Sequence, residues 1–115
     1  YLKLAELQYK DRDTYSGSYN VGPDDCDCVT TGELVDLFVK AWGESASWKD
    51  VSEANAPHEA GFLKLDCSKI KKVMKWQPKW HITKAIDSIV EWSKVYLANG
   101  DVVSCMENQI REYLR

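Results

Sequence analysis

Residues 65–80 read LDCSKIKKVMKWQPKW, and this stretch decides most of what the sequence predicts about the fold. Asp66 or Ser68 is a typical helix N-cap, because a short oxygen-bearing side chain accepts a hydrogen bond from a free amide of the first turn. Apolar side chains follow at helical spacing as far as Met74. Pro78 cannot continue a helix. The stretch therefore predicts a short capped helix followed by an extended exit.

The flanking sequence predicts a helix-rich α/β chain with about five helices and short strands. Further helices are expected at residues 1–9, 31–42, 84–98 and 104–114, and short strands at 18–21, 48–51 and 62–65. Thr30 and Glu33 fit a capping box at the start of the second of these helices. Thr83 is the expected cap of the long helix at 84–98.

Two apolar stripes mark the faces that the last two helices should bury. The longer helix carries Ile82, Ile86, Ile89, Val90 and Leu97. The final helix carries Met106, Ile110, Tyr113 and Leu114. Both stripes follow the period of an amphipathic helix, so we expect their side chains to form much of the core.

Composition limits the classes of function that this chain can have. It has 115 residues, 44% of them hydrophobic, and a formal net charge of −3. This balance argues against nucleic acid or an anionic membrane as partner, and no apolar run approaches the ~20 residues of a membrane span. We expect a cytoplasmic protein. Because Tyr1 begins what reads as the middle of a helix, we also expect a fragment.

The four cysteines are Cys26, Cys28, Cys67 and Cys105. No secretory signal is visible, so reduced thiols are expected rather than disulfides. The alternatives are a zinc site, formed by these cysteines with the two histidines, and a redox thiol pair. A single pair separated by one residue is closer than the usual ligand spacing, so we predict no metal site.

Three segments resemble the carboxyl-terminal lobe of the extended short-chain dehydrogenase/reductase family. They are Tyr-Asn-Val-Gly-Pro-Asp-Asp at 19–25, His-Glu-Ala-Gly-Phe-Leu-Lys-Leu-Asp-Cys-Ser-Lys at 58–69 and Trp-Gln-Pro-Lys-Trp at 76–80. The resemblance covers almost the whole chain and favours the branch of dehydratases that acts on a CDP-sugar. It implies that residues 1–30 are a remnant of a nucleotide-binding Rossmann domain and that residues 31–115 are the substrate-binding lobe.

The resemblance also implies a reaction that this chain should not perform alone. Such enzymes hold NAD in a Rossmann domain, oxidise the sugar at C4, eliminate water across C5 and C6, and return the hydride to C6. They need a glycine-rich turn for the pyrophosphate and a Tyr-x-x-x-Lys pair for proton transfer. Neither motif is in this sequence. We therefore expect an inactive fragment that binds no NAD itself, completed by the missing Rossmann domain or paired as a homodimer.

Glu59, His58 and Asn20 are the substrate-binding residues that the resemblance suggests. Glu59 lies seven positions before Asp66, where relatives place an acid that accepts from the nucleotide ribose. His58 would take part of a diphosphate contact that relatives make with an arginine, here replaced by Ala56. Asn20 lies in a loop near the substrate mouth. The alternative for each is an ordinary loop residue, and no catalytic residue is predicted.

A different class of function remains open. The chain can instead be a non-enzymatic helical module that binds a protein partner through an apolar face. Such a module would have no affinity for CDP, which separates it from the enzyme fragment.

Overall fold

The structure is a computed structural model that describes residues 1–51 and 64–115, and all regular elements in these ranges are helices. In chain order they are α1 (Leu2–Lys10), α2 (Arg12–Tyr15), the 3-10 turn η1 (Asp25–Asp27), α3 (Thr31–Trp42), α4 (Ser68–Met74), α5 (Ile82–Leu97) and α6 (Val102–Leu114). The five predicted helices are present, and α2 is an additional short one. The chain is helix-rich, as expected, but the α/β class is wrong for the described residues.

The α/β class is wrong because none of the predicted strands is present in the described residues. Residues 18–21 and 48–51 are irregular, and so are Lys64 and Leu65, the described end of the strand expected at 62–65. A strand needs a neighbour to satisfy its backbone groups. Residues 18–21 pair with no strand within the described ranges, and the Lys69 ammonium donates to the Ser18 carbonyl at 3.0 Å instead.

Helix α3 begins at the predicted capping box. The Thr30 hydroxyl accepts from the Glu33 amide at 3.3 Å, and the Glu33 carboxylate accepts from the Thr30 amide at 2.7 Å. Gly43 ends the helix with φ of +70°, a conformation that favours glycine. Both predicted boundaries are confirmed.

Helix α4 is the centre of the small apolar core. The N-cap of α4 is Cys67, so the prediction that Asp66 or Ser68 occupies that position is wrong; the Asp66 carboxylate, one residue earlier, accepts from the Ser68 amide at 2.9 Å. The left-handed Lys75, with φ of +51°, ends the helix before Pro78. Buried Cys67, Ile70 and Met74 are covered by Leu4, Leu7, Tyr15, Tyr19, Val73 and Trp76. Residues from both sides of position 30 build this cluster, and the division into two domains stays a prediction.

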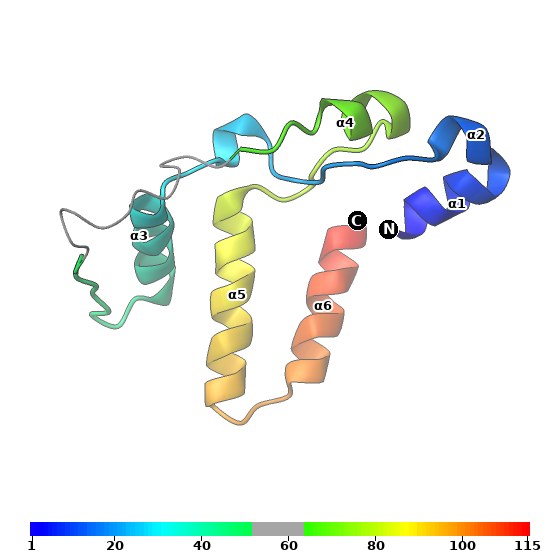
Figure 1. The fold of residues 1–115 in the computed structure, drawn as a ribbon. Coiled ribbons are helices and arrows are strands. Elements are labelled where there is room, and N and C mark those ends of the chain that lie inside the picture. The colour runs from blue at the N-terminus through cyan, green and yellow to red at the C-terminus, as the bar shows by residue number, and fades with distance from the viewer. Residues whose placement is uncertain (52–63) are drawn as a thin grey trace.

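Helix α5 lies between α3 and α6, with which it forms a layer below the segment that carries η1 and α4 (Figure 1). Ile86 and Val90 are its buried apolar side chains. The Lys94 ammonium donates to the Trp42 carbonyl at 2.7 Å and so ties α5 to the end of α3. Helix α6 returns antiparallel to α5 after a short turn (Figure 1).

Much of the predicted apolar core is exposed. Ile89 is 51% exposed, and Leu97, Met106, Ile110 and Leu114 are also open to solvent. The radius of gyration is 18.2 Å, whereas a compact chain of this length has about 13 Å. The stripes form apolar faces, but parts of these faces have no covering element within the described residues, so the prediction that they are buried is wrong for these side chains. None of the described helices has the length and apolar character needed to cross a membrane.

Candidate functional site

Two of the motif segments, far apart in sequence, lie against each other. The Asn20 side-chain amide donates to the Asp66 carbonyl at 3.1 Å, and the Lys69 ammonium donates to the Ser18 carbonyl at 3.0 Å. Gly22 permits the close approach, because a Cβ there would lie 3.2 Å from the Cys67 sulfur. The loop at 18–25 is therefore docked on the start of α4.

Two ion pairs join the same segments. Lys64 pairs with Asp25 at 2.5 Å, and Lys71 pairs with Asp24. The hydrogen bond to Asp25 raises the pKa of Lys64, and the hydrogen bond to Asp24 raises the pKa of Lys71. Both lysines, which are cations at neutral pH in any case, thus keep their charge to a higher pH.

The loop at 18–25 and the start of α4 form an open polar hollow of about 430 Å³ between them. Its lining consists of Pro23, Asp25, Lys64, Leu65, Asp66, Cys67, Ser68 and Lys71. Hydrogen bonds from Ser68 lower the pKa of Asp66, so this carboxylate is ionised. Two ammonium groups, a hydroxyl and carboxylates in one hollow suit a ligand that carries both phosphate and hydroxyl groups.

The predicted site residues have different outcomes. Asn20 lies in the docked loop, where its amide is bound to the backbone of Asp66, a residue of the hollow. Glu59 and His58 lie outside the described residues, so their predicted roles stay predictions. Lys64 and Lys71 were not singled out from the sequence. Their local pattern is that of ordinary surface lysines, and only the docking of the loop brings them together.

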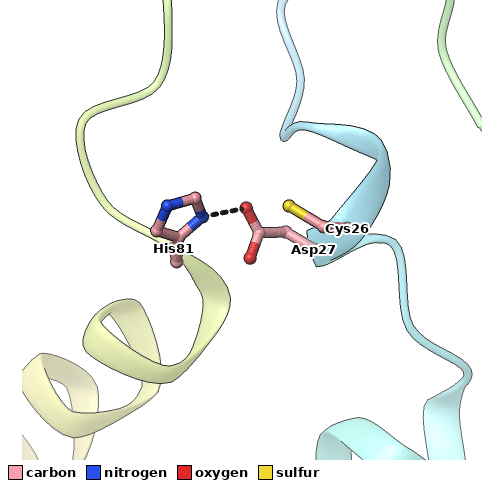
Figure 2. Close-up of side chains that lie close together, drawn as sticks. All are labelled: Cys26, Asp27 and His81. Carbon is pink, nitrogen blue, oxygen red and sulfur yellow. Dashed lines mark hydrogen bonds and ion pairs between the residues drawn. The ribbon is translucent and has the colours of Figure 1, made fainter.

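A second cluster lies where η1 meets the start of α5. The Asp27 carboxylate accepts from the Ile82 amide at 2.9 Å with one oxygen and lies 2.9 Å from His81 Nδ1 with the other (Figure 2). Helix α5 thus begins at Ile82 with His81 as N-cap, and the prediction that Thr83 caps it is wrong. The cap comes from a residue more than fifty positions away, which no local motif could reveal.

The charges of this cluster support one another. The backbone hydrogen bond from Ile82 is the main cause of the lowered pKa of Asp27, and the bond with His81 lowers it further. The hydrogen bond with Asp27 in turn raises the pKa of His81. Asp27 is only 6% exposed, whereas His81 is open to solvent.

The cysteines do not gather with one another in the described residues. Cys28 donates to the Asp24 carbonyl at 3.6 Å, Cys67 and Cys105 are buried in different places, and Cys26 is exposed. Cys26 does, however, lie with Asp27 and His81, and their ligand-type atoms are all within 4.8 Å of one another. The zinc alternative drawn from the sequence included the two histidines, His81 among them, but not Asp27, whose approach to His81 depends on the fold.

Comparison with known sequences finds similarity to an enzyme of the dehydratase class. No protein-family model matches the chain. A curated relative is the CDP-glucose 4,6-dehydratase of Salmonella typhimurium (strain LT2), which is 38% identical over 114 residues. The alignment covers 99% of this chain but only 32% of the dehydratase, so the chain spans about a third of that relative. The resemblance expected from the sequence motifs is confirmed, and it is consistent with a carboxyl-terminal part of such an enzyme.

Proposed function

We propose that this chain is the nucleotide-sugar-binding part of an NAD-dependent CDP-glucose 4,6-dehydratase. The 38% identity with the Salmonella dehydratase along nearly the whole chain carries the proposal. The whole enzyme would convert CDP-glucose to CDP-4-dehydro-6-deoxyglucose, a precursor of deoxysugars. NAD and the proton-transferring pair would belong to a Rossmann domain, because this sequence has neither motif. A cytoplasmic location and a homodimer stay predictions.

The polar hollow is the part of the described structure that best suits the nucleotide diphosphate. Lys64 and Lys71 are its cations, and a diphosphate would compete with Asp25 and Asp24 for them. Such charge-assisted bonds are stronger than neutral ones. This arrangement would compensate for Ala56, where relatives place an arginine.

The binding step is testable with this chain. We expect CDP to bind, and Lys64→Met or Lys71→Met to weaken its affinity on the order of tenfold, since each removes a hydrogen bond to a charged group. Lys72→Met is the matched control, because Lys72 is exposed on α4 and does not line the hollow. Titration calorimetry with CDP and with CDP-glucose measures the affinity of the unsubstituted chain and its loss in each variant. Equal effects of Lys71→Met and Lys72→Met would remove the hollow from the proposal.

The parent reaction has a separate test in the encoding gene. Reading the frame upstream of the Tyr1 codon should reveal a Gly-x-x-Gly-x-x-Gly turn and a Tyr-x-x-x-Lys pair. Their presence would make the chain part of a complete dehydratase. A start codon at or just before Tyr1 would contradict the enzyme proposal, whatever the chain binds.

A helical protein-interaction module is the second candidate, and the exposed apolar side chains favour it. Ile89 on α5 and Ile110 on α6 are each about half exposed. A module of this kind would bury that face against a protein and would show no response to CDP in the same titration.

A further inference from the structure

The cluster at the start of α5 combines three kinds of metal ligand from two distant segments. Cys26 and Asp27 come from η1, and His81 comes from the N-cap position of α5. One ligand-type atom from each lies within 4.8 Å of the other two. Figure 2 shows the Cys26 sulfur beside the Asp27 carboxylate, on the side of the carboxylate oxygen that meets His81.

The orientation of His81 distinguishes a metal site from a nucleophilic one. Nδ1 faces Asp27, and the second ring nitrogen points away from both Asp27 and Cys26 (Figure 2). A Cys-His-Asp nucleophile would need the thiol at the second ring nitrogen, with the acid at the first. Here Nδ1, the nitrogen that faces Asp27, lies within 4.8 Å of the thiol and the carboxylate, so one potential ligand atom of each residue is close enough for a shared ion.

We propose that Cys26 Sγ, one Asp27 oxygen and His81 Nδ1 bind a divalent transition-metal ion of the zinc type, with solvent completing the coordination. Zinc takes thiolate, imidazole and carboxylate ligands together, whereas calcium and magnesium prefer oxygen alone. A thiolate and a carboxylate also neutralise the two charges of the ion. This balance matters because the N-terminus of α5 is itself partially positive and opposes a cation.

The cluster needs only small movements to accept the ion. Ligand atoms in a tetrahedral zinc site lie roughly 3.3–3.8 Å apart, as bond lengths of about 2.0–2.3 Å require. Cys26 and His81 are exposed and each is held by a hydrogen bond with Asp27, whereas the buried Asp27 is also fixed by the Ile82 amide. The Asp27–His81 hydrogen bond would be exchanged for two bonds to the metal. One Asp27 oxygen would still cap α5.

Cobalt(II) is the probe of choice, because a thiolate ligand gives it a charge-transfer band in the near ultraviolet. We expect this band on titrating the reduced chain, and displacement of the cobalt by zinc. Cys26→Ser should abolish the band and weaken zinc binding by about tenfold or more, the scale on which even ligand-supporting residues affect affinity. Cys28→Ser is the matched control, because Cys28 lies two residues away and outside the cluster. Cys28→Ser should retain both the cobalt band and the zinc affinity of the unsubstituted chain.

His81→Gln tests the nitrogen ligand without removing the cap. We expect a loss of zinc affinity similar to that of Cys26→Ser, with circular dichroism confirming that the helices persist. The proposal is overturned if the unsubstituted chain gives no thiolate band. It is equally overturned if Cys26→Ser and Cys28→Ser bind alike, since the metal would then be held by thiols without the cluster, or if His81→Gln binds like the unsubstituted chain.

Discussion

Ile86 and Ile89 are three residues apart on α5 and should respond very differently to truncation. Ile86 is 6% exposed, whereas Ile89 is 51% exposed. Replacement of either by alanine removes three carbon atoms and changes the intrinsic helix propensity by the same small amount. The two variants therefore isolate the effect of burial at a constant chemical change.

The expected magnitudes follow from the burial. Three carbons at about 0.8 kcal/mol each amount to about 2.4 kcal/mol when fully buried. We expect Ile86→Ala to lower the free energy of unfolding by about 2–3 kcal/mol, near the low end of core truncations because the surrounding structure is open. Ile89→Ala should cost less than about 1 kcal/mol, since half of its side chain is already in water.

Urea unfolding of the two variants, followed by far-ultraviolet circular dichroism, measures the difference. Thermal unfolding should show a fall in Tm of roughly 10 °C for Ile86→Ala. Equal destabilisation by the two substitutions would refute the reasoning. It would mean that Ile89 is covered in solution, and the cost of Ile89→Ala would then depend on protein concentration if a second copy provides the cover.

Two further predictions concern the helix starts. Asp27 raises the pKa of His81 above its usual 6.5. The pair therefore stabilises the fold fully below about pH 6.5, and this stabilisation is lost as the pH rises through the raised pKa of His81. The pKa of Asp27 is lowered, so the stabilisation that its carboxylate provides is lost only in acid. His81→Gln should therefore flatten the dependence of stability on pH above about pH 6.5, and an unchanged slope in urea unfolding would contradict this. Thr30→Ala should cost about 1 kcal/mol through loss of the capping box, and Thr31→Ala, one position into α3, much less.

Features that depend on neighbouring residues in the chain could be predicted from the sequence. The capping box at Thr30 and Glu33 and the end of α3 at Gly43 are local, because the groups that bond are within a few residues of each other. The predicted strand at residues 18–21 failed because a strand is defined by its partner. The same reason explains the stripe on α5, where periodicity marks an apolar face without saying what covers it.

The candidate site depends even more on contacts between distant segments, which the sequence alone does not predict. Asn20 could be selected from the motif that contains it, and its bond to Asp66 places it at the junction. Lys64 and Lys71 gain significance only because the loop at 18–25 docks beside them. The contact between Asp27 and His81 likewise depends on the path of the chain between them, which no local pattern encodes.

The remote cap also has a consequence for the order in which the molecule assembles. Helices α5 and α6 are joined by a short turn and can pair early, since closing a short loop costs little entropy. The Ile82 amide gains its acceptor only when η1, more than fifty residues earlier, arrives with Asp27. Hydrogen exchange at Ile82 should thus report the docking of η1, whereas exchange in the middle of α5 should report the unfolding of the helical pair.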